Sequence, residues 1–277
     1  MSFLRCGAFE LSLARPRIMG IVNVTPDSFA DGGRYAGTER ALAHANSLVE
    51  QGADIVDVGG ESTRPGAEAV DAQRELERVL PVLQGLRGIG VPVSIDTSKP
   101  EVMSAAIAAG ASMVNDVNAL QAEGALDAVA SSGAALCLMH KQGDPKSMQH
   151  HPHYVDVVAE VRQFLGQRVA AAQRAGIALE RIAIDPGFGF GKTLEHNLML
   201  LRHLDRFADM GAALLVGLSR KAMFGKITGA AVGERAHASV AAALLAVQKG
   251  ARIVRVHDVK ATRDALAVLA AVAGPSL

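Results

Sequence analysis

The feature that most constrains the fold of this chain is an eightfold alternation of short apolar runs and longer helix-like segments. Strands that alternate with helices form parallel sheets, and eight such units are the number that closes into a barrel. The sequence therefore predicts an α/β protein built as a (β/α)8 barrel. The expected strands are Arg17–Val24, Asp54–Val58, Val91–Ile95, Ser112–Val117, Ala134–Met139, Arg181–Ile184, Ala213–Gly217 and Arg252–Val256.

Helix signals fill the intervals between these runs. Ser98 to Glu101 has the pattern of a capping box with Pro100 in the first turn, and Gly110 stands where the same helix should stop. An open doubly wound sheet is the alternative, but it needs fewer strands or a topological switch point. The expected helices are Thr38–Gln51, Asp71–Leu86, Pro100–Ala109, Glu123–Ser132, Tyr154–Ala175, Leu194–Phe207, Glu234–Lys249 and Val259–Ala273.

The N-terminal segment precedes the first of these strands. Two short apolar patches within Phe3–Leu11 lie on either side of Cys6 and Gly7, and they predict a small hairpin that covers the barrel floor. A length of 277 residues is ordinary for one barrel, although length alone leaves the number of domains open. We expect one domain over residues 1–277.

Charge and cysteine content restrict the partners and the compartment. Lys plus Arg and Asp plus Glu both number 28, so no basic field is available to hold nucleic acid or an anionic membrane, and any anion site must be local. Cys6 and Cys137 are too few for a disulfide framework, and the N-terminus lacks the order of a signal peptide. We therefore expect a cytoplasmic protein.

Acidic and amide side chains end several of the expected strands. The active site of a closed parallel barrel is built at the carboxyl ends of its strands, so Asp96, Asn115 and Asp185 should face one ring. Asp96 could instead be an ordinary loop acid, and Asn115 must be paired by a neighbouring strand end or by a ligand. Without matching internal cations, this set predicts a flat heterocycle that presents an amino group beside a ring N–H.

Cations and hydroxyl groups occupy the other side of the ring and predict an anion site. Arg255 and His257 are two residues apart at a strand end, so both side chains leave the same face. The loops after strands seven and eight commonly bind phosphate in this fold. Arg220 is equally well explained as a surface cation. The full set is Arg64, Lys221, Arg255 and His257, with Thr63 and Ser219 as hydroxyl donors.

Asn23 ends the first strand and is a candidate metal ligand. Its neutral carbonyl oxygen can bind a hard cation, and Mg²⁺ commonly takes one or two protein oxygens together with substrate phosphates and water. An amide that closes the following turn is the simpler interpretation. The cationic side chains opposite favour Mg²⁺.

Two other patterns suggest sites that we do not expect. Residues 187–193 resemble a nucleotide-binding P-loop, but Pro186 replaces its first glycine, and Thr193 is better explained as a helix cap. His150, His151 and His153 resemble a metal cluster, yet no cysteine or carboxylate lies nearby in this polar loop. A solvated loop is the better interpretation.

Taken together, the strand-end motifs are similar to those of the dihydropteroate synthase family of the folate pathway. The resemblance runs from the N-terminal hairpin to the last helix. The methyltetrahydrofolate-binding domain of corrinoid methyltransferases also has a barrel and a pterin pocket, but the loop Thr63–Pro65 and the pair Arg255 and His257 argue against it. The motifs are NVTPDSFADGG, DVGGESTRPGA, SIDTSKP, NDV, LMHKQGDPKSMQ, DPGFGFGKT, GLSRKAM and VRVHDV.

The resemblance implies a role for each candidate residue. The pterin ring would be held by Asp96, Asn115, Met139, Asp185, Phe190, Gly217 and Lys221. The diphosphate would be bound by Asn23 through Mg²⁺ and by Thr63, Arg64, Arg255 and His257. The 4-aminobenzoate would contact Phe29, Thr63, Pro65, Phe190, Ser219 and Lys221, once the loops with Gly32, Gly33 and Gly66 close. The catalytic residues would be Asp96, Lys221, Arg255 and His257.

The implied reaction joins a dihydropterin-methyl diphosphate to 4-aminobenzoate and releases diphosphate. An aromatic amine needs no base before it attacks, so we expect dissociative loss of diphosphate, with Mg²⁺ and cations stabilising the leaving group and Asp96 the pterin cation. Ala222 stands where many members carry a hydroxyl residue, so it offers no hydroxyl contact to the benzoate carboxylate, for which Arg220 or the helix N-terminus could compensate. The apolar helix Ala238–Val247 predicts a homodimer through the last helices. A pterin-binding protein without synthase activity is the alternative from another class.

Overall fold

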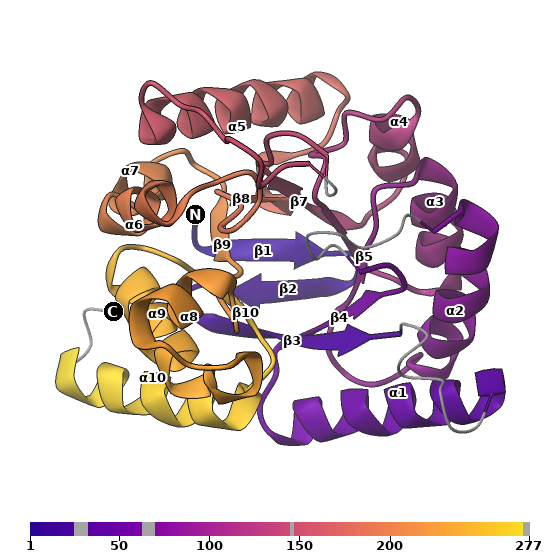
Figure 1. The fold of residues 1–277 in the computed structure, drawn as a ribbon. Coiled ribbons are helices and arrows are strands. Elements are labelled where there is room, and N and C mark those ends of the chain that lie inside the picture. Colours follow the sequence, from indigo (N-terminus) through magenta and orange to yellow (C-terminus); the bar gives the residue numbers. More distant parts are fainter. Residues whose placement is uncertain (25–32, 63–69, 145–146, 274–277) are drawn as a thin grey trace.

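A closed barrel of eight parallel strands forms the centre of the fold, in the order β10-β3-β4-β5-β6-β7-β8-β9 (Figure 1). The computed structural model describes residues 1–24, 33–62, 70–144 and 147–273. The predicted (β/α)8 barrel is therefore confirmed, and the open sheet is excluded. The barrel strands are β3 (Arg17–Asn23), β4 (Ile55–Gly59), β5 (Val93–Asp96), β6 (Met113–Asp116), β7 (Ala135–Met139), β8 (Ile182–Asp185), β9 (Ala213–Val216) and β10 (Ile253–Val256).

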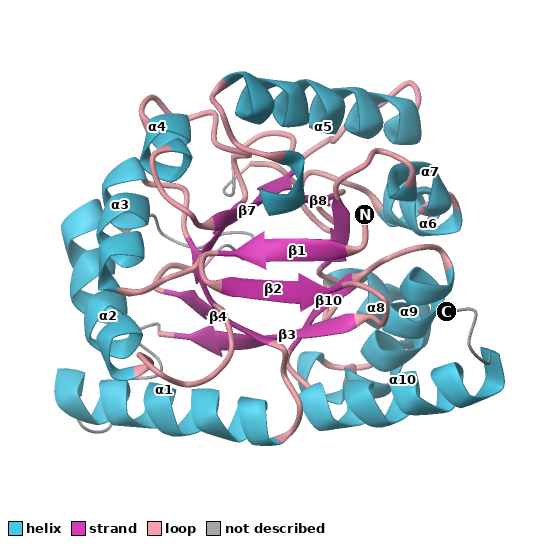
Figure 2. Ribbon diagram, turned by 180° about the vertical axis from the view of Figure 1, so that it is seen from behind, coloured by secondary structure: helices cyan, strands magenta, loops and turns pink. Residues whose placement is uncertain are grey.

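Helices form a ring around this barrel (Figure 2). They cover the outward faces of the strands with an apolar layer in which side chains such as Val56, Leu136 and Val254 are fully or almost fully buried. The helices are α1 (Gly33–Glu50), α2 (Ala72–Gly85), α3 (Pro100–Ala109), α4 (Ala125–Ala130), α5 (Val157–Arg174), α6 (Leu194–Arg202), α7 (Asp205–Ala208), α8 (Ala222–Thr228), α9 (Ala236–Gln248) and α10 (Val259–Ala273), with single 3-10 turns at Leu179–Arg181 and Val232–Glu234.

The predicted hairpin is also confirmed. It consists of β1 (Phe3–Cys6) paired antiparallel with β2 (Phe9–Ser12), and it crosses the centre of the helical ring in both ribbon views (Figures 1 and 2). Leu4 and Cys6 pack into the cluster that fills the lower barrel interior. The backbone N–H of Gly7 donates to the Gly133 carbonyl at 2.9 Å, which fixes the hairpin to the base of β7.

The inward-facing residues change from apolar to polar along the barrel axis. At the hairpin end the interior is filled by apolar side chains, including Met19, Met113 and Ile253. Side chains alternate between the two faces of a strand, so the next inward residues toward the carboxyl ends are two positions further on. These positions carry the charged and amide groups. The register then brings Asp96 opposite Asn115 on neighbouring strands.

Four local features differ from the expectations. Helix α1 begins at Gly33, before the expected start at Thr38, and the segment expected as one helix over Leu194–Phe207 is divided into α6 and α7. Helix α8 was not expected. The capping box before α3 is wrong, because Lys99 is the N-cap and makes no side-chain cap bond, although Pro100 does occupy the first turn.

Cys6 and Cys137 are both buried and unbridged, as expected. Among the described residues, no helix combines the length and the apolar character that crossing a membrane requires.

Candidate active site

A pocket of about 1120 Å³ opens at the carboxyl ends of the barrel strands. It brings together every described residue of the predicted site, so separate surface locations are excluded for them. Phe29, Thr63, Arg64 and Pro65 lie outside the described residues, as do Gly32 and Gly66. The predicted residues that line the pocket are Asn23, Asp96, Asn115, Met139, Asp185, Phe190, Gly217, Ser219, Lys221, Arg255 and His257.

Arg255 joins two carboxylates in the middle of the pocket floor. Its Nε donates to Asp57 Oδ2 at 2.5 Å, and its Nη2 donates to Asp96 Oδ2 at 2.7 Å. Asn115 Nδ2 donates to the same Asp57 oxygen at 3.2 Å. The expectation that the inward acids lack an internal cation is therefore wrong, because Arg255 reaches across the barrel from β10 to β4 and β5.

Burial strongly perturbs the carboxyl group of Asp96. It raises the pKa of Asp96 to about 7, with Asp57 acting in the same direction and Arg255 opposing both. Two acids beside one guanidinium leave the cluster with an excess of negative charge. A ligand that donates N–H groups would stabilise this charge, which agrees with the heterocycle predicted from the sequence.

Asp57 is the central residue that the sequence interpretation missed. Its side chain is fully buried, and its Oδ1 has no hydrogen-bond partner among the described residues. The residue lies inside the apolar run IVDVG of β4, where it resembled part of a buried strand. Its spacing of two from Gly59, which pairs with Asp96, places Asp57 on the inward face and could have identified it.

A second acidic corner lies across the pocket at the end of β8. Asp185 accepts the N–H of Gly187 at 2.8 Å, and burial raises the pKa of its carboxyl group while Lys221 opposes that shift. The Lys221 ammonium lies 4.2 Å from the centre of the Phe190 ring. Burial lowers the pKa of Lys221 to about 8, with Asp185 acting against it. These three side chains form one wall with an acid, a cation and an aromatic face.

Ser219 and His257 form the anion side of the pocket. The Ser219 hydroxyl oxygen lies 2.9 Å from His257 Nδ1 and accepts the backbone N–H of His257 at 3.2 Å. These contacts orient the imidazole, with Nδ1 toward Ser219 and Nε2 on the other side of the ring. His257 and Arg255 share one face of β10, as their spacing predicted.

Asn23 is exposed at the end of β3, which pairs with β10, so it lies on the strand next to Arg255 and not opposite the cations as expected. The ideal position of a Cβ on Gly59 would lie 4.0 Å from Asn23 Oδ1 and 3.8 Å from Asp96 Oδ2, so the missing side chain of Gly59 leaves space between these oxygens. The described residues hold no cluster of three or more His, Cys, Asp or Glu side chains suited to a metal ion. An amide oxygen of this kind fits a Mg²⁺ site in which substrate phosphates and water supply the other ligands.

Several strand-end residues are used within the fold. Asp116 accepts the backbone N–H groups of Asn118 and Leu120, both at 2.7 Å. Arg220 binds Asp258 through Nη2 at 2.6 Å, so the expectation that it could compensate for Ala222 has no support from this geometry. Thr193 caps α6 as predicted, in a capping box with His196.

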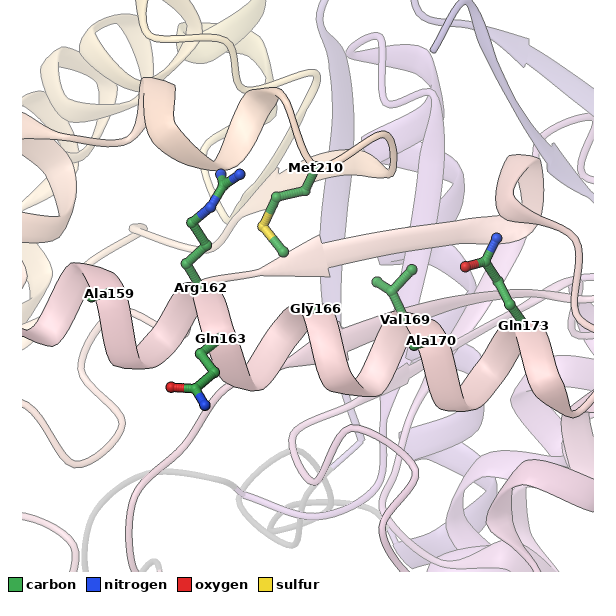
Figure 3. A pocket seen from close by; sticks show the side chains of 8 residues that line it. All are labelled: Ala159, Arg162, Gln163, Gly166, Val169, Ala170, Gln173 and Met210. Carbon is green, nitrogen blue, oxygen red and sulfur yellow. The ribbon is translucent and has the colours of Figure 1, made fainter.

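A second hollow of about 490 Å³ lies on the outer surface along α5 (Figure 3). Gly166 lies at its middle with Met210 above, and Ala159 and Gln173 lie at its two ends (Figure 3). Arg162 is paired with Asp209. The hollow is lined by no carboxylate and by none of the strand-end residues, so the pocket at the carboxyl ends is the candidate active site.

Comparison with known proteins agrees with this geometry. The family model described as "Pterin binding enzyme" matches residues 19–257. A dihydropteroate synthase of Neisseria meningitidis serogroup C is 54% identical over 267 residues, covering 95% of this chain and 94% of that protein.

Two solved structures share nearly the whole fold. Xanthomonas albilineans dihydropteroate synthase with 4-aminobenzoic acid has a TM-score of 0.93 at 54% identity, covering 99% of this chain and 98% of the other. Burkholderia cenocepacia dihydropteroate synthase complexed with 7,8-dihydropteroate has a TM-score of 0.90 at 48% identity, covering 98% of this chain and 96% of the other.

Proposed function

The chain belongs to the pterin-binding enzymes and, among them, to the dihydropteroate synthases, and from its pocket we propose how it carries out that reaction. Its substrates are (7,8-dihydropterin-6-yl)methyl diphosphate and 4-aminobenzoate, and its products are 7,8-dihydropteroate and diphosphate. The observation that carries this proposal is the convergence of Asp96, Asn115 and Asp185 with Lys221, Arg255 and His257 in one pocket. A pterin-binding protein without synthase activity would not require Arg255 and His257 beside the acids.

The pterin ring binds to the acidic part of the pocket. Asp185 and Asn115 face it from neighbouring sides, so they can accept and donate hydrogen bonds to its amino group and ring nitrogens. Met139, Phe190 and Gly217 provide the apolar and flat surfaces against which the ring lies. Lys221 is held between Phe190 and Asp185, where it can donate to a ring acceptor.

The diphosphate binds to the cationic rim. Arg255 lies in β10 and His257 directly follows this strand, while Asn23 ends the adjacent strand β3, where it would hold Mg²⁺. When bound, Mg²⁺ would supply positive charge to the diphosphate oxygens. Asp96 stabilises the cationic pterin left when the carbon–oxygen bond breaks, and 4-aminobenzoate then attacks the methylene carbon beside Phe190 and Ser219. The predicted contacts of Phe29, Thr63, Arg64 and Pro65 belong to the same proposal.

Diphosphate release, measured with and without 4-aminobenzoate, tests this function. We expect sustained release only when both substrates are present, with one dihydropteroate formed for each diphosphate. Binding of the pterin substrate without turnover would instead identify a non-catalytic pterin-binding protein.

Replacing Asn23 by alanine should raise the Mg²⁺ concentration needed for half-maximal turnover by about tenfold, because the only proposed protein ligand is lost. The measurement is a Mg²⁺ titration of diphosphate release by both proteins. Binding of 6-hydroxymethylpterin, which carries no phosphate, is the control and should not change in either protein. An unaltered titration curve would remove Asn23 from the metal site.

We also infer a homodimer through the last helices. Leu245 on α9 is 49% exposed, and Val268 and Val272 on α10 are 65% and 82% exposed. These large apolar side chains lie on two helices that pack against each other, so they form one surface that association would bury.

Replacing Val268 by glutamate should convert this dimer into monomers, because a charge would be buried at the interface. Sedimentation velocity at micromolar concentration measures the change. Val155→Glu is the matched control, because Val155 is 95% exposed on the opposite side of the barrel, before α5. A wild-type protein that sediments as a monomer would contradict the inference.

A further inference from the structure

Lys192 is buried in the loop that joins β8 to α6. Its side chain is only 3% exposed, although it is a lysine and no carboxylate accepts a hydrogen bond from it among the described residues. A buried ammonium is costly unless its N–H groups are satisfied. The proposed chemistry does not use this side chain, so its burial requires another explanation.

Four acceptors surround the Lys192 ammonium. Nζ lies 2.9 Å from the Gly187 carbonyl, 3.0 Å from the Phe190 carbonyl and 2.9 Å from His140 Nδ1, and the His140 carbonyl is a more distant fourth at 3.4 Å. An ammonium has three N–H donors, so the three nearer acceptors satisfy it if His140 Nδ1 accepts. Burial, with Lys192 acting in the same direction, lowers the pKa of His140 to about 3, which keeps the imidazole neutral.

These acceptors come from two different loops that pack backbone against backbone. His140 follows β7, whereas Gly187 and Phe190 follow β8. A Cβ on Gly187 would overlap the carbonyl oxygen of His140, and a Cβ on Gly191 would overlap that of Gln142. Lys192 donates to acceptors of both loops, so it holds the two loops together.

The loop that Lys192 holds contacts three residues of the proposed pterin site or carries them. The Phe190 carbonyl is one of its acceptors, and the Phe190 ring contacts Lys221 in the pocket. Gly187, whose carbonyl is another acceptor, donates its N–H to Asp185. A rotation of this loop would therefore move the aromatic wall and the acid together.

We propose that Lys192 is a positioning residue that fixes Phe190 and Lys221 for substrate binding by clamping the loop after β8 to the loop after β7. The proposal rests on the proposed synthase function. It does not place Lys192 in contact with substrate. It assigns the glycine-rich segment 187–191 a structural purpose, in place of the phosphate binding that its sequence suggests.

Lys192→Met tests this role, because methionine keeps much of the length but removes all three donors. We expect kcat/KM for the pterin substrate to fall by about thirtyfold, and 6-hydroxymethylpterin to bind at least tenfold more weakly. Lys249→Met is the matched control, because Lys249 lies after α9 at the other end of the barrel, and it should retain wild-type values.

A double-mutant cycle with Phe190→Ala separates positioning from general destabilisation. If Lys192 acts through Phe190, then Lys192→Met should change kcat/KM by less than about threefold in the Phe190→Ala background. Equal losses in both backgrounds would overturn the proposal. His140→Phe is a second variant for the case that Lys192→Met does not fold, because it keeps a ring against Phe164 but removes one acceptor.

His140→Phe should lower kcat/KM by about fivefold in the wild-type background and by less than twofold with Phe190→Ala. Equal losses in both backgrounds, or none, would count against the clamp. Measuring the wild-type protein in the same assay separates a failure of the proposed clamp from a failure of the proposed synthase function. Absence of wild-type turnover would refute the synthase reaction, whereas pterin binding by the variants still decides whether Lys192 positions the loop.

Discussion

Asp96→Asn is expected to lower the turnover number by about a hundredfold or more while leaving the protein folded. The carboxylate lies where the pterin cation would form, and an amide of the same shape cannot stabilise that charge. The fold should survive, because an asparagine oxygen can still accept the N–H of Arg255 that now reaches Asp96 at 2.7 Å. Steady-state diphosphate release gives the turnover, and thermal unfolding gives the stability.

The pH dependence provides a control for this variant. The pKa of Asp96 is about 7 in the folded protein, above its ordinary value of 3.8. Between these pH values the folded state binds more protons than the unfolded state, so this group makes folding less favourable as the pH rises through that window. Pterin affinity should rise as the pH passes through about 7, where the Asp96 carboxyl of the folded protein ionises. Asp96→Asn should lack this rise, and a variant with near-normal turnover would refute the role of Asp96.

The barrel was predictable because its signals are local. Each buried parallel strand is a short apolar run, and each helix is marked by caps such as Thr193 or by a terminal glycine such as Gly110. Helix α8 was missed because it has only seven residues, with Gly225 in the middle, and so lacks a clear helical period. The break between α6 and α7 was missed because the apolar pattern continues across it, with Leu204 fully buried at the junction.

The members of the site were predictable, but their pairing was not. Strand ends meet at one rim in any closed parallel barrel, and that rule placed Asp96, Asn115 and Asp185 in one pocket. The bond from Arg255 to Asp57 depends on how far a long side chain reaches across the barrel, which spacing along the chain does not specify. Asp57 was therefore missed, and the inward acids were expected to lack a matching internal cation.

The ion pair of Arg255 and Asp57, which the sequence interpretation missed, explains how the site keeps the Asp57 carboxylate away from water. The hairpin and the apolar lower barrel close the floor beneath Asp57, whose side chain has no exposed surface. Arg255 is the cation that compensates this acid, and it is 20% exposed toward the pocket. It thus connects the buried acid to the space where diphosphate is proposed to bind.

Arg255→Met should lower the free energy of unfolding by about 3–5 kcal/mol and abolish turnover. The variant leaves Asp57 buried without its cation, and it also removes a proposed partner of the diphosphate. Urea unfolding measures the first effect from the shift in midpoint at an unchanged slope. Lys260→Met is the control for loss of an ion pair, because its partner Asp264 is 51% exposed, and it should leave the unfolding midpoint almost unchanged.

The double variant Asp57→Asn with Arg255→Met distinguishes the two roles of the arginine. Removing both charges leaves no uncompensated carboxylate at position 57, and Asn115 can still donate to the new amide oxygen, so most of the lost stability should return. Turnover should not return, because the cation beside the diphosphate is still absent. If the double variant were as unstable as Arg255→Met alone, the destabilisation would arise from lost packing of the arginine stem and not from the buried charge of Asp57.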